Sequence, residues 1–478
     1  MSKLKNIIKQ LSTTDYNSIY KSLMENNAEK SAYLLKFMRE KQLSDAKIME
    51  ELEVNTNAYY TLRSRLNQKI EEHLLHEMES PRTTLLKKVS TINEILFTKK
   101  KAIAIATLKK LEKELLDYDL SNELTIVYKT LKKLQINSPD QFNYSQLYNR
   151  HVAYMLALDK AEDLLAEYFK KYGNFLLTRD ENEKFGLSLL KNEMDNVAKL
   201  HQSHRLYVYQ NCINIFHRLF IEKDRPESEE DSIEAIFEKV QGIFDSYYLD
   251  SIYYHLKLVF EYLKFEYYSK TSVFRKAEKY YEEVNESISP LLTNYNLYTF
   301  SPQFLLSKLE RSLRLDVEIN LYEENKALFE DYELDKNNTS QLVIYSLYRA
   351  LACYYSEKFD ESARWLNSMF NEHSLKRMPF LHLEIKLILA LQYCLTKDYE
   401  LFNQLINSIQ RQIRQLGKGN CVYILIFTKI LKMSLNDLKK SKANKIQSYI
   451  NKLNKAKPAY FSPLQFIKMD EEFISRLS

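Results

Sequence analysis

Apolar residues recur through most of this sequence at the spacing of one helix face. The stretch TTLLKKVSTINEILF (83–97) is typical, and its apolar positions include Leu85, Val89, Ile92, Ile95 and Leu96. Residues three or four positions apart lie on the same side of an α-helix, so this stretch predicts an amphipathic helix. Prolines, which open or stop helices, separate many such stretches. The pattern predicts many helices joined by short polar loops.

Glycine is scarce, and its scarcity excludes several fold classes. There are 5 glycines and 8 prolines in 478 residues, whereas glycine averages roughly 7% of protein sequences. β-Hairpins and bulges need glycine or proline, and phosphate-binding loops need glycine for close backbone approach. We therefore predict an all-α fold.

Four stretches resemble half of a tetratricopeptide unit, in which a small residue lets two antiparallel helices approach and aromatic residues fill the space beside it. Three of them have matching residues at the expected spacing: Leu389, Ala390, Tyr393 and Tyr399; Tyr268, Phe274, Ala277 and Tyr281; Ala350, Phe359 and Leu366, with Ser362 as the small residue. The fourth matches loosely at Phe97, Ile103 and Ala106. Where the first stretch should carry a second alanine, it has Phe402.

These half-motifs predict an array of helical hairpins over residues 81–478, after an N-terminal helical domain over residues 1–80. The expected fold is a tetratricopeptide-like α-α hairpin superhelix, a right-handed solenoid. Phe359 and Tyr399 are 40 residues apart, longer than the standard repeat of ~34. An irregular all-helical domain is the alternative.

Residues 44–70 have the layout of a helix-turn-helix: SDAKIMEEL, then EVN, then TNAYYTLRSRLNQKI. Ser44 has a side chain that can cap the first helix, and either Asn55 or Thr56 can cap the second. The expected small core consists of Leu52, Val54, Tyr59 and Leu62. A recognition helix contacts DNA through exposed polar and basic side chains, and the candidates are Asn57, Thr61, Arg63, Arg65, Gln68 and Lys69.

Three features of this hairpin argue against DNA binding. The turn has Glu53 where a left-handed residue, usually glycine, is expected, and Met49 replaces the small packing residue. The acids Glu50 and Glu51 lie near the expected path of a phosphate backbone. Residues 1–100 hold 17 Lys/Arg and 13 Asp/Glu, a net charge of +4, and dedicated DNA-binding domains are usually more basic.

Positive charge is concentrated at the end of the sequence. The net charge of the chain is +5, but residues 401–478 hold 14 Lys/Arg and 4 Asp/Glu, a net of +10. The segment 439–457 supplies most of the excess. It is either a solvated helix face or a basic docking patch for an acidic partner or a phosphate backbone, formed by Lys439, Lys440, Lys442, Lys445, Lys452, Lys455 and Lys457.

The cysteines and the apolar segments favour a cytoplasmic protein. Cys212, Cys353, Cys394 and Cys421 are far apart and lie in apolar surroundings, which predicts buried free thiols in a reducing compartment. The N-terminus lacks the features of a signal peptide. The most apolar run, residues 421–427, is far shorter than the ~18 residues of a membrane span.

Catalytic signatures are missing from the sequence. It contains no GxSxG, Walker A, HExxH or EF-hand loop. His73 and His76 lie one helical turn apart, but a zinc site needs further ligands that the sequence does not assign. The stretch QLGKGN (415–420) has Gly417 where a helix would end in a left-handed residue. We expect no enzyme activity, no cofactor and no metal.

A family resemblance covers most of the chain in pattern. The stretches LKNIIKQLST (4–13), LEVNTNAYYTLRSRLNQKI (52–70) and RALACYYSEKFDESARWLNSMF (349–370) resemble a group of uncharacterised helical-repeat proteins of Bacteroidota. In these proteins an N-terminal helix-turn-helix-like piece precedes degenerate tetratricopeptide-like hairpins. The resemblance implies a fold and assigns no chemistry.

The sequence therefore predicts an interaction scaffold that binds a peptide or partner helix of another protein in the groove of a helical-repeat superhelix. The alternative is a transcriptional regulator in which residues 44–70 contact DNA and the array senses a ligand or dimerises. A homodimer is compatible with either function, and no membrane association is expected.

Overall fold

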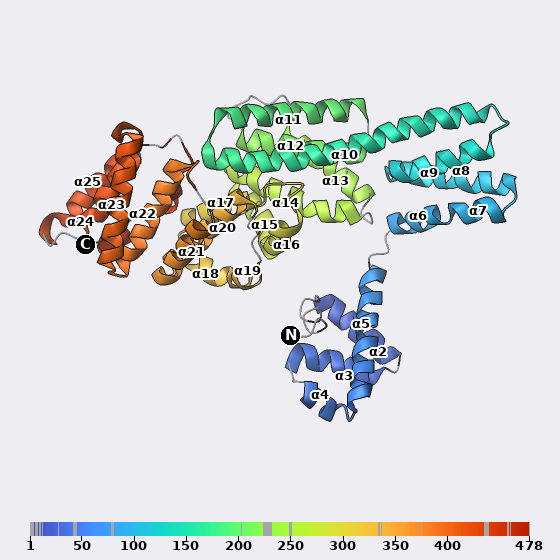
Figure 1. Cartoon of the computed structure of the whole chain (residues 1–478), viewed down its shortest axis with the longest axis horizontal. Helices are drawn as coiled ribbons and strands as arrows, with labels where there is room; N and C mark the ends of the chain where they lie inside the picture. Colours follow the sequence, from blue (N-terminus) through green and yellow to red (C-terminus); the bar gives the residue numbers. More distant parts are fainter. Residues whose placement is uncertain are drawn as a thin grey trace. The chain divides into compact units, whose positions relative to one another are not determined.

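The chain is described by a computed structural model. It covers residues 4, 8, 11, 13–26, 28–41, 45–77, 81–201, 203–222, 232–247, 251–332, 335, 337–373, 375–434, 439–456, 458 and 460–477. Within these ranges the regular elements are all helices and no strand occurs, which confirms the predicted all-α fold (Figure 1).

The chain divides into two compact units, each described here by itself. Unit 1 comprises residues 1–149 and 247–254, and unit 2 comprises residues 150–246 and 255–478. The long helix α10 (Asp140–Thr178) belongs to unit 1 up to residue 149 and to unit 2 thereafter. The expected boundary between an N-terminal domain and an array at residue 80 stays a prediction.

Unit 1 contains two hydrophobic clusters, one formed by residues between 4 and 70 and one by residues between 85 and 144. The amphipathic stretch 83–97 is divided by a turn at Thr91 into two helices. The elements of this unit before α10 are α2 (Thr13–Glu25), α3 (Glu29–Lys36), the π-helical turn η1 (Phe37–Lys41), α4 (Asp45–Glu51), α5 (Thr56–Glu77), α6 (Pro81–Ser90), α7 (Ile92–Thr98), α8 (Lys101–Asp117) and α9 (Ser121–Leu134).

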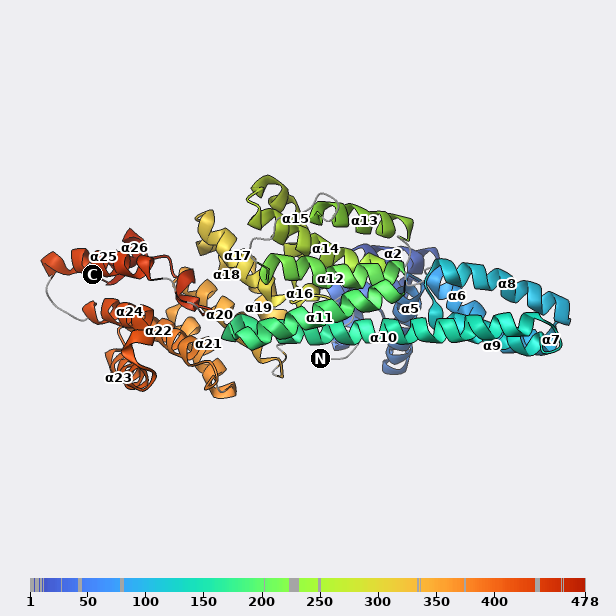
Figure 2. The ribbon, with the colours of Figure 1, turned by 90° about the horizontal axis from the view of Figure 1, so that it is seen from above.

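Unit 2 continues from α10 as a succession of antiparallel helices. In two views at right angles α10 and α11 lie side by side (Figure 2), and Lys160–Glu193 and Lys171–Glu183 ion pairs join them. The helices after α10 are α11 (Glu181–Leu200), α12 (His204–Phe220), α13 (Ile233–Ser246), α14 (Ser251–Lys270), α15 (Phe274–Glu286), α16 (Ile288–Asn294), α17 (Pro302–Arg314), η3 (Glu318–Asn320), α18 (Leu321–Glu324), α19 (Lys326–Asp331), α20 (Thr339–Tyr355), α21 (Phe359–Glu372), α22 (Pro379–Leu395), α23 (Tyr399–Leu416), η4 (Lys418–Cys421), α24 (Val422–Met433), α25 (Lys439–Lys455), η5 (Pro463–Phe466) and α26 (Glu471–Leu477).

The same turn joins the helices of several hairpins in both units. Its central residue has a positive φ although it is not glycine: Glu53 (48°), Asp119 (50°), Ser272 (60°), Glu357 (58°) and Lys397 (61°). In each case the next residue's N–H donates to the carbonyl oxygen five positions back, at 2.8 to 3.1 Å. This is the Schellman arrangement that ends a helix. The chain thus makes sharp turns without glycine, at a cost of about 1 kcal/mol or more each.

In three of the four predicted half-motifs the small residue is buried as expected, but the aromatic residues Phe274 and Tyr399 are exposed. Ser362 on α21 is fully buried, and its Oγ donates to the carbonyl oxygen of Ala350 on α20 at 2.8 Å, so the two helices approach closely there. Ala277 and Ala390 are also buried. The loose fourth match is wrong as a packing motif, because Phe97 is 90% exposed and Ile103 and Ala106 are exposed as well.

Gly173 on α10 lies at a close approach to the start of α20. A Cβ atom at this position would lie 2.2 Å from the Ser340 Oγ at the start of α20 and 2.9 Å from the Phe300 ring. Only glycine fits without movement of both neighbours. This contact also fixes the position of the preceding residue, Tyr172, against helices that come later in the sequence of unit 2.

The segment after α25 returns to helices much earlier in the sequence. We call residues 460–468 the strap. The carbonyl oxygen of Phe466 accepts a hydrogen bond from the Tyr355 hydroxyl at 2.6 Å, and the Lys468 N–H donates to the same hydroxyl at 3.0 Å. The short helix η5 within the strap packs on both α17 and α22. The strap therefore connects the middle of unit 2 to its last hairpins.

Candidate functional site

The predicted helix-turn-helix is a helical hairpin with most of the expected details. Helix α5 begins at Thr56, and Asn55 is its cap, because the Asn55 Oδ1 accepts a hydrogen bond from the Ala58 N–H at 2.9 Å. Leu52 and Tyr59 are buried in the surrounding cluster, and Met49 packs against it. Glu53 takes the left-handed conformation without glycine. Ser44 and the side chains of Asn57 and Gln68 lie outside the described part.

The basic residues of α5 do not share one face. Thr61, Arg65 and Lys69 are exposed and follow one another at intervals of four, so they form a single stripe. Arg63 is about 200° away around the helix and is half-buried, with its guanidinium 5.6 Å from the centroid of the Tyr59 ring. The structure therefore separates Arg63 from the other candidate contacts.

Arg65 and Lys69 line a groove of about 620 Å³ in unit 1. Its other walls come from the turn between α2 and α3, with the polar residues Ser22, Asn26, Glu29, Lys30 and Ser31. Three cations and one acid give this groove a net positive lining. A groove of that kind can accept an anionic group.

The basic docking patch predicted in segment 439–457 is smaller than the sequence indicated. Lys445, Lys452 and Lys455 are exposed on α25, and the Lys452 ammonium lies 5.4 Å from the Tyr449 ring centroid. Lys442 is only 6% exposed, and its ammonium donates to the Ser434 carbonyl oxygen at 2.7 Å. It does not belong to the exposed face. The side chains of Lys439, Lys440 and Lys457 lie outside the described part.

The prediction about the cysteines agrees with the structure, whereas the left-handed cap predicted at Gly417 does not form. All four cysteines are free and buried, and burial raises the pKa of Cys353 to about 12. Gly417 follows α23 with φ of +88°, but its ψ of 130° differs from the left-handed helical value of a cap. No group of three potential metal ligands occurs in the described ranges, and the His73 and His76 side chains are outside them.

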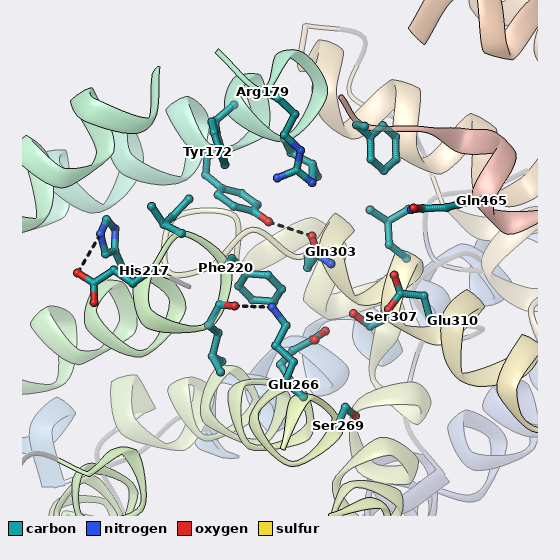
Figure 3. Close-up of a pocket in the computed structure, with 18 of the residues that line it drawn as sticks. Tyr172, Arg179, His217, Phe220, Glu266, Ser269, Gln303, Ser307, Glu310 and Gln465 are labelled. Carbon is teal, nitrogen blue, oxygen red and sulfur yellow. Dashed lines mark hydrogen bonds and ion pairs between the residues drawn. The ribbon is translucent and has the colours of Figure 1, made fainter. Parts of the chain in front are cut away.

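A large pocket in unit 2, which we call the polar pocket, was not predicted. Its volume is about 1220 Å³, above the roughly 300–1,000 Å³ of small-molecule sites. One face each of α10, α14 and α17 points into it, together with parts of α11 and α12 and the strap (Figure 3). The pocket-lining polar residues of the three helices, together with Arg179 directly after α10, are Tyr172, Arg179, Glu266, Ser269, Lys270, Gln303, Ser307, Glu310, Arg311 and Arg314.

Glu266 is the most unusual residue of the polar pocket. Its side chain is 1% exposed, and its Oε1 has no hydrogen-bond partner within the described structure. Burial raises the pKa of Glu266 to about 8, while the nearby Ser307 hydroxyl and Lys270 ammonium oppose the shift. Burial also raises the pKa of Glu310, one of the other lining carboxyls. At neutral pH Glu266 is therefore mostly a neutral acid.

The neighbouring polar groups of the pocket are already engaged with one another or with the backbone. The Tyr172 hydroxyl donates to the Gln303 Oε1 at 3.0 Å. The Lys270 ammonium donates to the Leu219 carbonyl oxygen and lies 3.6 Å from the Phe220 ring centroid. Arg311 pairs with Glu278 through two of its nitrogens. These contacts hold the pocket's walls in place, and none of them involves the Glu266 Oε1.

The strap forms one wall of the polar pocket and is held by a second buried carboxyl. Glu384 on α22 is 0% exposed, and its Oε2 accepts hydrogen bonds from the Ser462 hydroxyl at 2.5 Å and the Leu464 N–H at 3.2 Å. Burial raises the pKa of Glu384 to about 7. Strap residues Phe461, Gln465 and Phe466 face the pocket.

A signal for the pocket exists in the sequence but does not identify it. Along α17 the polar residues Gln303, Ser307, Glu310, Arg311 and Arg314 recur at intervals of one helical turn beside a leucine-rich face. This pattern is also that of an ordinary solvated helix face. Which other helices meet that face depends on tertiary packing.

The comparisons with known proteins give no relative for this chain: no family model, no curated protein and no solved structure matches it. The arguments about its function therefore rest on its own residues. Among the described helices, none is both long and apolar enough to cross a membrane.

Proposed function

We propose that the protein is a non-enzymatic interaction scaffold that binds a peptide of a partner protein in the polar pocket. The observation that carries this proposal is the size and composition of the pocket: about 1220 Å³, with walls from several helices and the strap. Alternating aromatic and polar groups suit a peptide, whose side chains need apolar contact and whose backbone needs hydrogen bonds.

The strap supports an extended peptide as the ligand. The strap is a mainly non-helical segment that lies against α17 and α22. Two side chains of unit 2 bind backbone atoms of the strap: Tyr355 binds Phe466, and Glu384 binds Leu464. Backbone hydrogen bonds of this kind bind peptides with little dependence on their sequence. The same helices thus already hold one segment of chain beside the polar pocket.

We further propose that the hairpins of unit 2 form a tetratricopeptide-like, right-handed superhelix. Support comes from the repeated turn: α14–α15, α20–α21 and α22–α23 are each joined by three residues with a left-handed residue in the centre. Identical turns produce similar angles between successive helices, and similar angles generate a solenoid. Four buried free thiols fit a reducing compartment, so we place the protein in the cytoplasm.

The test is the selection of binders from a random peptide library displayed on phage against the full chain. Selected peptides are then measured by fluorescence anisotropy against the wild type and Ser307→Arg, which fills the pocket. We expect micromolar binding that falls at least tenfold in Ser307→Arg and is unchanged in Ser408→Arg, an α23 variant outside the pocket. If no peptide is enriched, or if both variants bind equally, the proposal fails.

The alternative is a transcriptional regulator that contacts DNA through the α4–α5 hairpin. The groove lined by Arg65, Lys69 and Lys30 favours it, as does the left-handed Glu53, which supplies the turn that a helix-turn-helix needs. The test is an electrophoretic mobility shift with mixed DNA at low salt. We expect the Arg65→Ala/Lys69→Ala variant to lower the salt dependence by about two phosphate contacts, and Arg63→Ala to change it less. Absence of any shift at low salt excludes this alternative.

A further inference from the structure

We propose that the polar pocket recognises a basic side chain of its peptide, the ammonium of lysine or the guanidinium of arginine, with Glu266 and Glu310 as the acceptors. This inference rests on the proposed peptide-binding function and adds the chemical class of the residue that enters the pocket. It begins from the unpartnered carboxylate oxygen at the pocket floor.

Glu266 combines a place in the pocket lining with a buried carboxyl oxygen that has no hydrogen-bond partner among the described residues. The residue lines the pocket and its Oε1 lacks a partner within the described structure. In Figure 3 the Glu266, Ser307 and Glu310 side chains approach one another from α14 and α17 at one side of the hollow. A buried polar atom without a partner destabilises a fold. Such an atom facing a pocket is therefore a strong candidate for ligand contact.

The cations that line the pocket do not satisfy these carboxyls. Neither Glu266 nor Glu310 forms an ion pair among the described residues, although Lys270 and Arg311 are on the same helices. The Lys270 ammonium is held by the Leu219 carbonyl oxygen. Arg311 is held by Glu278, and Arg314 is also near that residue, at 3.9 Å. An incoming cation therefore displaces no ion pair of the described residues, although the Lys270 charge already acts on both carboxyls.

The rest of the pocket fits a long basic side chain. The Tyr172 hydroxyl oxygen, the Gln303 amide and the Ser307 hydroxyl offer further acceptors near the carboxyls, and the rings of Phe220 and Phe461 offer apolar surface. Lysine and arginine side chains pack their methylene groups on such surface while the charged end binds oxygen atoms. At the side of the pocket where Glu266 and Glu310 lie, an acidic side chain would gain nothing from these acceptors, although cations such as Arg179 and Lys184 line other parts of it.

The protonation of Glu266 gives this inference a distinct signature. Its pKa of about 8 is set by burial, with Ser307 and Lys270 opposing the shift and Glu310 adding to it. Tyr172 of α10 and Tyr262 of α14 also face it, and burial keeps both phenols protonated. When a cation binds, the O–H bond of Glu266 breaks, the carboxylate pairs with the cation, and the proton leaves to the buffer. Binding near pH 7 should therefore release up to one proton.

The experiment compares two small probes of nearly equal shape, N-butylguanidinium, which is charged, and N-butylurea, which is neutral. Their affinities for the full chain are measured by isothermal titration calorimetry in buffers of different ionisation enthalpy. We expect the guanidinium to bind at least tenfold more tightly than the urea, with proton release. Glu266→Gln should weaken guanidinium binding at least tenfold and abolish the proton release, Glu310→Gln should weaken it severalfold, and the exposed Glu282→Gln should match the wild type.

Equal affinity for the two probes, or unchanged binding by both Glu266→Gln and Glu310→Gln, overturns the inference. The comparison of the two probes on the wild type still tests the inference if one of the variants fails to fold. The selected peptides separate this inference from the proposed function. In each peptide that binds, every lysine or arginine is replaced by norleucine. If the affinity is unchanged, the peptide site stands and the basic-residue inference is wrong. If the guanidinium binds but no peptide does, the cation site stands alone.

Discussion

The α4–α5 hairpin and the α14–α15 hairpin beside the polar pocket contain the same kind of turn, but their polar side chains differ in exposure. In the hairpin the left-handed Glu53 connects two helices whose candidate contact residues Thr61, Arg65 and Lys69 are all exposed. In the pocket the left-handed Ser272 connects α14 to α15, yet α14 carries a carboxyl that is almost wholly buried. A recognisable motif and an energetically unusual site thus occur in different units. In this chain, buried polar groups therefore indicate a site of specific chemistry better than the layout of a motif does.

The largest expected effect concerns the pH dependence of unit 2. Burial raises the pKa of Glu384 to about 7, from an ordinary value of 4.5. The folded chain then holds a proton that the unfolded chain has lost, so the free energy of unfolding falls as the pH rises from about 4.5 to about 7. Since each pKa unit corresponds to ~1.4 kcal/mol, Glu384→Gln should remove up to about 3 kcal/mol of this decline.

Urea unfolding measured at several pH values between about 5 and 8 checks this expectation. Trp365 is the only tryptophan and lies on α21, so its fluorescence reports on unit 2 specifically. The exposed Glu282→Gln is the matched control and should keep the wild-type slope. Parallel pH profiles for the wild type and Glu384→Gln would show that the Glu384 carboxyl, which holds the strap, affects stability no more than an ordinary surface acid does.

The second effect tests the helix approach beside Tyr172. Gly173→Ala places a Cβ 2.2 Å from the Ser340 Oγ and 2.9 Å from the Phe300 ring, so we expect the free energy of unfolding to fall by about 1–3 kcal/mol. Gly242→Ala on α13 is the control, because nothing lies within 4 Å of its added Cβ, and it should gain roughly 0.5–1 kcal/mol. Trp365 fluorescence in urea measures both. Equal stability of the two variants would contradict the close packing of α10.

The third effect concerns the hairpin in unit 1. Asn55→Ala removes the cap whose Oδ1 binds the Ala58 N–H, and we expect a loss of about 1 kcal/mol in the stability of unit 1. Ser64→Ala, on the exposed face of α5, is the control and should change stability by only a few tenths of a kcal/mol in the opposite direction. Circular dichroism follows unfolding of the whole chain. A shift of the Trp365 transition by Asn55→Ala would mean that the hairpin also stabilises unit 2.

The smallest effect applies to both regions at once. Replacing a left-handed turn residue by glycine relieves its backbone strain, so Glu53→Gly and Lys397→Gly should each stabilise their own unit by about 0.5–1 kcal/mol. Arg411→Gly, at an exposed position within α23, should cost roughly 1 kcal/mol instead. Thermal unfolding by circular dichroism and Trp365 fluorescence distinguishes the units. A loss of stability in both turn variants would mean that the side chains at these turns contribute more than the strain costs.

The sequence predicted local structure well and tertiary assembly poorly. The helix start at Thr56, the cap at Asn55 and the close contact at Ser362 depend on neighbouring residues, whose periodicity and propensities are visible in the sequence. The burial of Lys442 and the exposure of Phe97 depend on whether another helix covers that position, and one amphipathic face looks like another until its partner is known.

The polar pocket shows the same limit more strongly. Its residues come from segments as far apart as Tyr172 and Gln465, and the spacing along α17 indicates a common face without indicating what opposes it. Glu266 lies in a run rich in tyrosine and leucine, where burial is a reasonable inference, but its free Oε1 follows only from the positions of α14 and α17. Distances between helices distant in sequence are not encoded in local periodicity.

The strap has a consequence for how the protein is made. Ribosomes deliver the chain from its N-terminus, and helices α10, α14 and α17 emerge long before residues 460–468. During that interval the face that later lines the pocket has no wall on the strap's side, and Glu384 has not yet met Ser462 or Leu464. A chain whose synthesis stops before residue 460 would lack this wall, and Glu384 would lack its two strap partners. The pocket wall on the strap's side can therefore form only after residues 460–468 have been synthesised.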